Sequence, residues 1–137
     1  MLRALSRPAP RALALVLAAA VLGGCGSPKP SPEQQVRQTV SEFGRATAAK
    51  DYPALCDRIL APRLVEQLQQ VGLPCEVALE HGLGDVKDPR LTIGRITVKG
   101  TTASAEVRTS ASGQAPSQDV LELVQVDGRW RISSLGR

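Results

Sequence analysis

The chain has 137 residues, and its 17 Lys and Arg against 13 Asp and Glu give a formal net charge of +4. Three of the basic residues lie in the first 24 positions, which hold no acid, so residues 25–137 carry 14 basic and 13 acidic groups and are nearly neutral. With three aromatic residues in total, the chain has neither the clustered cations nor the stacking side chains that nucleic-acid binding requires. Leu, Ile, Val and Phe make up 27 of the residues 25–137, which is enough for one folded domain.

Residues 1–24 have the pattern of a signal peptide. Arg3, Arg7 and Arg11 precede an uninterrupted apolar run at residues 12–22. As a helix this run would span about 16 Å, roughly half of a bilayer core, which is typical of a signal peptide and too short for a transmembrane helix. The alternative is a buried N-terminal helix, which the pattern disfavours because the segment has no polar face.

The motif Leu22-Gly23-Gly24-Cys25 follows the apolar run and resembles the lipobox of bacterial lipoproteins. In that family a diacylglyceryl group is attached to the cysteine sulfur, and the chain is cleaved before the cysteine. The resemblance therefore implies that Cys25 is a lipidation site. Residues 25–32 are rich in proline, which favours an extended tether, although an ordinary disordered terminus would have the same composition. We expect a lipid anchor in the cell membrane and a domain on its extracytoplasmic face.

The three cysteines support export. Lipidation of Cys25 would leave one pair, Cys56 and Cys75, in an oxidising compartment where disulfides persist. A bond between them would close a loop of about 20 residues and stabilise the fold by about 3 kcal/mol on the chain-entropy model. Two buried thiols are the alternative. The single His81 is too distant to complete a zinc site with these cysteines, so we expect no metal and no cofactor.

Residues 31–83 have the pattern of a series of helices. Ser31 and Gln34 flank Pro32 in the arrangement of an N-terminal capping box. One face of the first helix is predicted to carry Val36, Val40, Phe43 and Thr47, and this helix should end near residues 50–51. Further helices are expected to begin at Tyr52, after Ala61-Pro62, and at Cys75, the last of these running to Leu83.

From residue 91 the hydrophobic period changes to two and predicts four antiparallel strands, at residues 91–99, 102–109, 119–126 and 129–135. Residues 110–117 are expected to form a flexible loop. Two hairpin turns set the register, and the predicted pairs are Val98 with Ala103, Ile96 with Ala105, Arg95 with Glu106, Gln125 with Trp130, Leu123 with Ile132, and Leu121 with Ser134. Leu91 and Ile93 have the wrong parity for the inner face, which predicts a β-bulge near Gly94.

Helices followed by an antiparallel meander imply an α+β fold, with N-terminal helices packed on a curved four-stranded antiparallel sheet. The chain resembles the nuclear transport factor 2-like superfamily, including SnoaL-like proteins, in the cone-shaped form found in bacterial lipoproteins. The resemblance rests on Val36, Val40 and Phe43, on residues 50–56 and on residues 124–132. It implies a domain at residues 33–137 whose sheet wraps the first helix and leaves a pocket. The residues expected at this pocket are Phe43, Tyr52, Leu123, Trp130 and Ile132.

Enzymes of this superfamily place acids, Tyr or His in the pocket, and this chain offers few such groups. His81 is expected at an exposed helix end, and Tyr52 is expected to pack at a helix start. Asp119 and Glu122 have opposite parity on one strand and cannot form a carboxylate pair on one face. We therefore expect no catalytic residues and interpret the protein as a non-catalytic module that binds a small hydrophobic ligand or a cell-envelope protein. The alternative is a pocket enzyme, isomerase- or cyclase-like, acting on a small hydrophobic molecule.

Overall fold

The computed structural model describes residues 24–136. The predicted signal peptide, with its three arginines and apolar run, lies outside the described residues except for Gly24. The elements follow in the order α1 (Pro32–Ala49), α2 (Tyr52–Ala54), the π-helix η1 (Leu55–Ile59), α3 (Pro62–Gln69), α4 (Cys75–Leu83), β1 (Arg90–Lys99), β2 (Thr102–Ala111), β3 (Gln114–Val126) and β4 (Arg129–Ser134). Of the helices in residues 24–136, none combines the length and the apolar character needed to cross a membrane.

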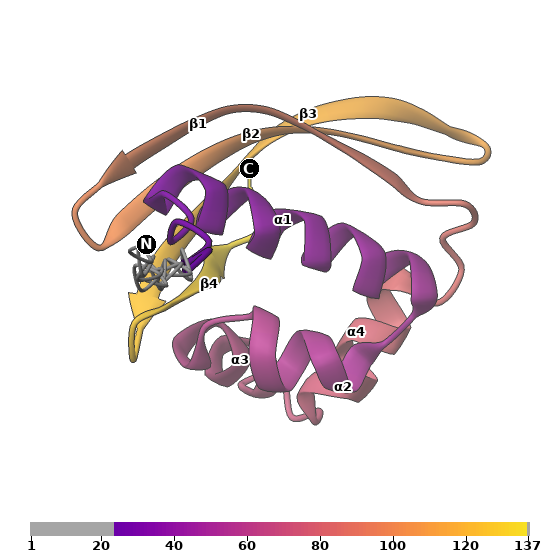
Figure 1. Ribbon diagram of the computed structural model, residues 1–137. Helices are drawn as coiled ribbons and strands as arrows, with labels where there is room; N and C mark the ends of the chain where they lie inside the picture. Colours follow the sequence, from indigo (N-terminus) through magenta and orange to yellow (C-terminus); the bar gives the residue numbers. More distant parts are fainter. Residues whose placement is uncertain (1–23, 137) are drawn as a thin grey trace, which may run out of the picture.

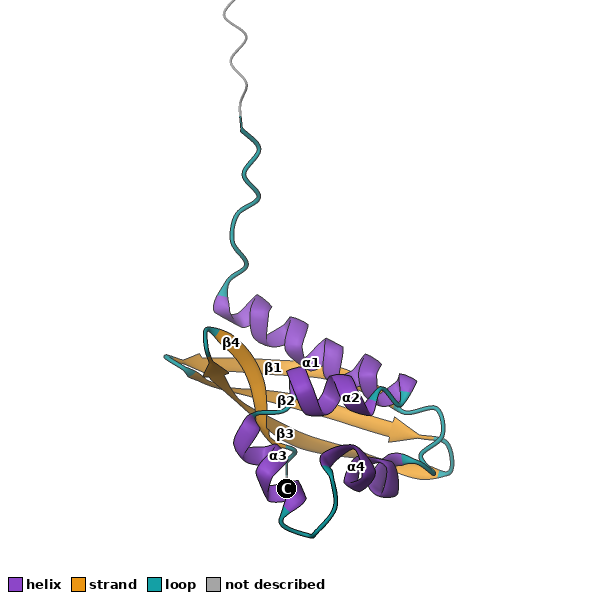
Figure 2. Cartoon of the chain, turned by 90° about the horizontal axis from the view of Figure 1, so that it is seen from below, coloured by secondary structure: helices purple, strands orange, loops and turns teal. Residues whose placement is uncertain are grey.

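The four strands form one antiparallel sheet in the order β1-β2-β3-β4, and this sheet curves over α1 (Figure 1). The other helices form a layer on the far side of α1 from β1 and β2. Residues 24–31 have no regular structure and lead away from the start of α1 (Figure 2). The prediction of an α+β fold with N-terminal helices on a curved four-stranded sheet is confirmed.

The sequence signals at the start of α1 form the predicted cap. The Gln34 backbone N–H donates to the Ser31 hydroxyl at 3.2 Å, and the Ser31 N–H donates to the Gln34 side-chain carbonyl at 2.8 Å. Val36 and Val40 are fully buried, so the predicted apolar face is the one that packs against the rest of the domain. Lys50 ends the helix in a left-handed conformation, with its φ at 55°.

The bulge predicted near Gly94 is present and corrects the parity of β1. The register runs from Ile96 opposite Ala105 to Ile93 opposite Val107, so one extra residue of β1 is accommodated. A side chain at Gly94 would place its Cβ 3.3 Å from the Glu106 carbonyl oxygen, which explains the glycine in this close approach. The bulge also interrupts pairing at Arg95. The ion pair expected between Arg95 and Glu106 is absent, since the ion pair found within residues 24–136 joins Glu33 to Arg37.

A second bulge, which the sequence did not indicate, lies between β3 and β4. Gln125 faces Trp130 and Leu123 faces Ile132 as predicted, but Ser134 pairs with Glu122 and not with Leu121. One extra residue of β4 is inserted after Ile132. Because strand side chains alternate between faces, this insertion turns Ser134 outward. Leu135 is thereby directed to the inner face, where it contacts the cavity described below.

The flexible loop expected at residues 110–117 is the tip of a long hairpin. Strand β2 continues to Ala111 and β3 begins at Gln114, with a two-residue turn whose Gly113 has a φ of +77°. The prediction was wrong because the backbone hydrogen bonds between neighbouring strands form between polar or small residues as well as between apolar ones. Pro116, which lacks an N–H, lies where a register shift leaves β3 with one extra residue.

All buried residues of the described chain lie between Val36 and Ile132, so the core formed by residues 24–136 lies entirely after Gly26. Trp130 is the largest side chain in it and is 4% exposed. It packs beneath the first half of α1, where the Thr39 hydroxyl lies 3.4 Å from the Trp130 carbonyl oxygen. The core therefore fills the end of the sheet nearest the start of α1.

Replacing this side chain tests the register of β4. Trp130→Ala is expected to lower the free energy of unfolding by about 3–5 kcal/mol, the usual cost of removing a large buried aromatic residue. Denaturant unfolding followed by circular dichroism measures the loss. Val120→Ala is the control, because Val120 is 45% exposed on the outer face and should cost less than about 0.5 kcal/mol. A Trp130→Ala loss as small as that of the control would contradict this packing.

Candidate functional site

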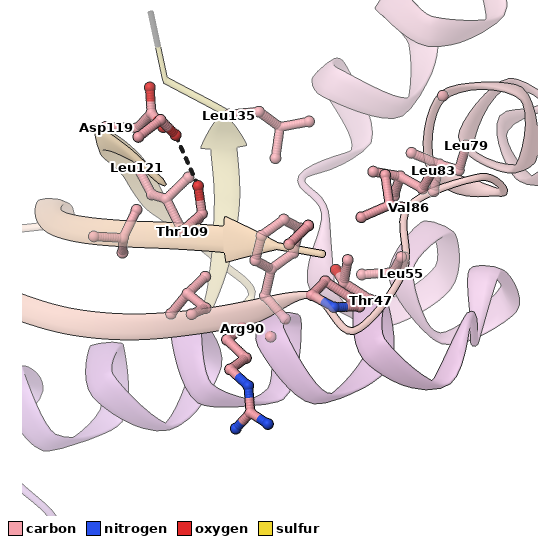
Figure 3. A pocket seen from close by; sticks show the side chains of 18 of the residues that line it. Thr47, Leu55, Leu79, Leu83, Val86, Arg90, Thr109, Asp119, Leu121 and Leu135 are labelled. Carbon is pink, nitrogen blue, oxygen red and sulfur yellow. Dashed lines mark hydrogen bonds between the residues drawn. The ribbon is translucent and has the colours of Figure 1, made fainter. Parts of the chain in front are cut away.

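A cavity of about 470 Å³ lies between the second half of α1, helix α4 and the inner face of the sheet (Figure 3). This volume is within the range of small-molecule sites. Its apolar wall comes from Phe43, Leu55, Leu60, Leu68, Leu79, Leu83, Val86, Leu91, Val107, Leu121 and Leu135. Leu55 and Leu60 are fully buried and form the floor, whereas Gly82, Gln114, Ala115 and Ser117 are exposed and mark the mouth.

Small residues on the helices leave the space that the cavity occupies. Gly44 of α1 packs so closely on β1 that an added Cβ would lie 3.3 Å from the Leu91 Cβ. On α4, Ala78, Leu79, Gly82 and Leu83 line the cavity, which is the spacing of one helical face. A Cβ at Gly82 would meet nothing within 4 Å. Ala78 and Gly82 on this face therefore leave space that larger side chains at those two positions would fill.

The inner face of the β2–β3 hairpin changes from apolar to polar toward the mouth. Val107 pairs with Asp119, and Thr109 pairs with Ser117, one step closer to the hairpin tip. The Thr109 and Ser117 hydroxyl oxygens are 2.8 Å apart, and the Ser117 hydroxyl donates to Asp119 Oδ2 at 2.8 Å. Figure 3 shows Asp119 and Thr109 on the opposite side of the cavity from Leu79 and Leu83. One side of an otherwise apolar cavity thus carries a hydroxyl–carboxylate chain.

A second polar atom lies in the wall formed by α1. The Thr47 hydroxyl is buried and has no hydrogen-bond partner in the described protein. A buried hydroxyl without a partner carries a desolvation cost of about 1–3 kcal/mol. Because Thr47 lines the cavity, a molecule bound in the cavity would supply the hydrogen-bond partner for this hydroxyl.

Contacts between neighbouring elements hold the rim of the cavity. The Lys50 ammonium, at the end of α1, donates to the Gly84 carbonyl oxygen at the end of α4. At the hairpin tip, the Ser112 N–H donates to the Lys87 carbonyl oxygen at 2.9 Å and the Ser112 hydroxyl to Asp88 at 2.8 Å. These contacts fasten residues 85–89, which include the cavity-lining Val86, to both α1 and the sheet.

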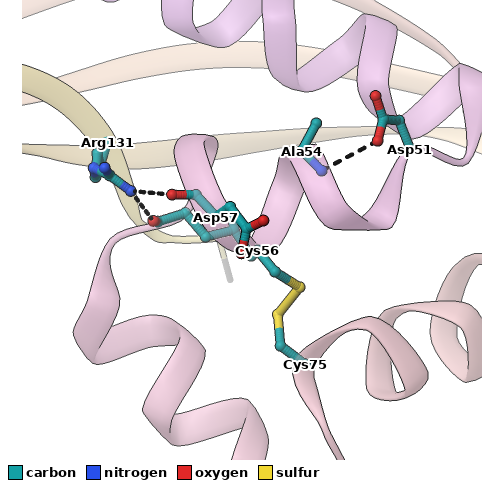
Figure 4. The surroundings of a disulfide bond; sticks show 7 residues. Asp51, Ala54, Cys56, Asp57, Cys75 and Arg131 are labelled. Atoms are coloured by element: carbon teal, nitrogen blue, oxygen red, sulfur yellow. Dashed lines mark hydrogen bonds between the residues drawn. A yellow bond between two sulfur atoms is a disulfide. The ribbon is translucent and has the colours of Figure 1, made fainter.

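The predicted disulfide is present and joins η1 to α4 (Figure 4). Cys56 lies in η1 and Cys75 is the first residue of α4, and their Cα atoms are 6.1 Å apart. On the other side of η1, the Arg131 guanidinium donates to the Asp57 carbonyl oxygen at 2.9 Å. The segment that supplies the cavity floor is thus fixed to α4 by a covalent bond and to β4 by a charged hydrogen bond.

Of the five residues predicted at the pocket, Phe43 lines the cavity and the other four do not. Leu123, Trp130 and Ile132 are at most 4% exposed and belong to the core, because the register places them at the end of the sheet that faces the start of α1. Tyr52 is half-buried against the core, and its buried hydroxyl has no hydrogen-bond partner among residues 24–136. Large apolar residues both fill the core and line the cavity, so their size and polarity alone did not separate the two groups.

The signal for the true lining was present in the sequence as small residues at helix positions, Gly44, Ala78 and Gly82, facing strands that end in Thr and Ser. Locating them required the register at the tip of the β2–β3 hairpin, residues 110–117, where a flexible loop was expected.

The cavity wall offers limited chemistry. Asp119 and Arg90 are the ionisable residues among those that line it, and the Arg90 guanidinium points away from the cavity (Figure 3). Neither His81 nor Tyr52 lines it, and Glu122 lies on the outer face opposite Ser104. Within residues 24–136, no group of three or more His, Cys, Asp or Glu side chains is arranged to hold a metal ion. Asp119 is an acid facing the cavity, but the other ionisable residue of the described wall, Arg90, points away and is not placed to share a proton transfer with it (Figure 3).

Solved structures with the same arrangement identify the fold. An NTF-2 like protein of unknown function from Silicibacter pomeroyi DSS-3 aligns with a TM-score of 0.52 and 20% identity, over 73% of this chain and 88% of that chain. A de novo designed NTF2 fold protein aligns with a TM-score of 0.50 and 17% identity, over 76% and 85% of the two chains. A SEC-C motif containing protein from Rhodopseudomonas palustris gives a TM-score of 0.51 and 20% identity, over 76% of each chain.

Sequence comparison adds one partial match. Residues 78–134, which are fewer than half of the chain, match a family profile described as "Putative lumazine-binding". This stretch holds most of α4 and all four strands, and therefore most of the cavity wall. No curated protein matches the chain.

Removal of the disulfide tests its contribution to the domain. The double variant Cys56→Ser, Cys75→Ser is expected to lose about 3 kcal/mol of stability, because the unfolded chain regains the freedom of a loop of about 20 residues. Thermal unfolding with and without reductant measures it. The reduced wild-type protein is the matched control and should unfold at nearly the same temperature as the double variant. Equal stability of oxidised and reduced protein would contradict a structural role.

Proposed function

From the NTF2-like fold and its cavity, we propose that the protein is a non-catalytic binding module that holds a small, mostly apolar molecule and is anchored to a membrane through Cys25. The observation that carries the proposal is the cavity of about 470 Å³ with an apolar wall and polar groups gathered on one side. Buried apolar surface supplies the driving force for binding, and a few polar groups fix the orientation of the ligand.

Two features support a binding role over catalysis. The wall has one carboxylate and no histidine, tyrosine or cysteine among its described residues. General acid–base chemistry needs positioned titratable groups, and most enzymes use more than one. The family profile that matches residues 78–134 is itself described by a binding property. The pocket-enzyme alternative requires Asp119 to work without a second carboxylate, histidine, tyrosine or cysteine among the described residues of the wall.

Anchoring through Cys25 is supported by the position of that residue. Cys25 is exposed and lies in the segment that leads away from α1, seven residues before the helix begins at Pro32. An extended segment of this length reaches about 20 Å at 3.1 Å per residue, enough to separate the domain from a membrane surface. The Cys56–Cys75 disulfide is consistent with an oxidising compartment.

Filling the cavity tests the binding role directly. Gly82→Leu places a branched side chain in open space at the mouth, and the exchange of a helical glycine should not destabilise α4. We expect a version of the protein that begins at Gly26 to bind the neutral apolar dye Nile red, and Gly82→Leu to weaken this binding at least about tenfold by steric exclusion. Fluorescence titration measures the affinity.

His81→Leu is the matched control, because His81 is exposed on the neighbouring position of α4 and does not line the cavity. It should leave dye binding unchanged. Equal loss in both variants, or none in either, would place the dye outside the cavity and count against the proposed site.

Lipidation is tested in the full chain by Cys25→Ser. The substitution removes the thiol that would carry the diacylglyceryl group, so the protein should shift from the membrane fraction to precursor or soluble material. Each buried methylene of an acyl chain adds about 0.8 kcal/mol to membrane affinity, so loss of the chains has a large effect. Fractionation with detergent extraction and intact-mass measurement detects the change. A membrane-bound protein of unmodified mass would refute lipidation.

A further inference from the structure

We propose that the ligand of this cavity is an amphiphile with an apolar body and a protonated amine, and that Asp119 and Thr109 accept hydrogen bonds from the amine. The inference rests on the proposed binding function and specifies the chemical class of the molecule bound. It comes from the direction of the hydrogen bonds at the polar side of the cavity, from the charge there, and from the apolar residues beside it.

The direction of the hydrogen bonds leaves the group formed by Thr109, Ser117 and Asp119 with acceptors only. Asp119 is a carboxylate, so the Ser117 hydroxyl proton is used in the 2.8 Å bond to Asp119 Oδ2. With that proton committed, the 2.8 Å contact between Ser117 and Thr109 must use the Thr109 hydroxyl proton. The protons of both hydroxyl groups are thus used in hydrogen bonds within this group of three side chains. The remaining capacity is the lone pairs of Thr109 Oγ1 and of the two Asp119 oxygens, which select a ligand group that donates.

The charge of this side favours a cationic donor over a neutral one. Within residues 24–136, no basic group lies within 4.0 Å of the Asp119 carboxylate. The guanidinium of Arg90, the basic residue of the wall, points away from the cavity (Figure 3). A hydrogen bond between an ammonium and a carboxylate is shorter and about twice as strong as one between neutral groups, so an amine gains more here than an alcohol.

The surroundings of Asp119 define the rest of the ligand. Leu121 follows it on the same face of β3, and Leu135 lies beside it (Figure 3). The backbone of the next residue, Gly136, is packed so closely that an added Cβ would lie 3.0 Å from the Asp119 Cβ. The carboxylate is therefore held at the edge of an apolar wall. A ligand whose amine meets Asp119 must carry apolar carbon directly behind it, toward Leu121 and the cavity floor.

Three ligands with the same ten-carbon body test the inference: decylamine, 1-decanol and decanoate. Each competes with Nile red for the protein that begins at Gly26, at concentrations where none forms micelles. The expected order of affinity is decylamine, then decanol, then decanoate, with the amine binding about tenfold to a hundredfold more tightly than the carboxylate. In Asp119→Asn the advantage of the amine should fall to less than about threefold, because the carboxamide is neutral and presents donors of its own.

Glu122→Gln is the matched control. It removes the same charge three residues away on the same strand, but from the opposite face of the sheet, so the amine preference should persist. Competition by all three ligands with equal affinity would leave the binding function standing and overturn the amine assignment, as would a preference for decanoate. An amine preference that survives Asp119→Asn would likewise overturn it. Failure of the dye and of all three ligands to bind would instead refute the proposed function.

Discussion

Two β-bulges determine where the cavity lies, because each one reverses which side of a strand faces α1. Before the bulge at Gly94, the residues of β1 that face inward are Leu91 and Ile93; without it they would face solvent. After the bulge in β4, Leu135 turns inward where an uninterrupted strand would turn it out. Bulges also bend a sheet. One kind of backbone irregularity therefore both curves the sheet over α1 and supplies the apolar side chains for the space beneath the curve.

The sheet divides along its length into a part that stabilises the domain and a part that encloses the cavity. Near the start of α1, the interior is filled by Leu123, Trp130 and Ile132, whose exposed fractions are 4% or less. Toward the end of α1 the facing residues become small or polar and the interior opens. Packing that is lost around a cavity costs stability. The disulfide and the Lys50–Gly84 contact both lie at this second end, where they offset that cost and hold α4 in place against η1 and α1.

The sequence predicted the features that depend on local chemistry. Three of these features have a signal within a few residues: the capping box at Ser31, the hairpin turn at residues 127–128 and the parity conflict that requires a bulge near Gly94. The pairing of Cys56 with Cys75 follows from the number of cysteines. The cavity lining could not be predicted in this way. It depends on which residues of α1, α4 and two strands meet in space, and the long β2–β3 hairpin that brings Thr109 to Ser117 has polar residues that favour no particular structure.

The fixed rim has a consequence for how a ligand would be bound. Residues 85–89 are held at one end by the hydrogen bonds of Ser112 and adjoin α4, whose first residue is covalently bonded to η1. Binding sites built from mobile segments lose affinity to the ordering of those segments. Here the walls are connected to one another before a ligand arrives, so the ordering cost is small, and the affinity is governed by the fit of the apolar body and by the polar contacts at Thr109 and Asp119. Selectivity among apolar molecules of similar size must then come from those few polar atoms, since an apolar wall discriminates weakly between them.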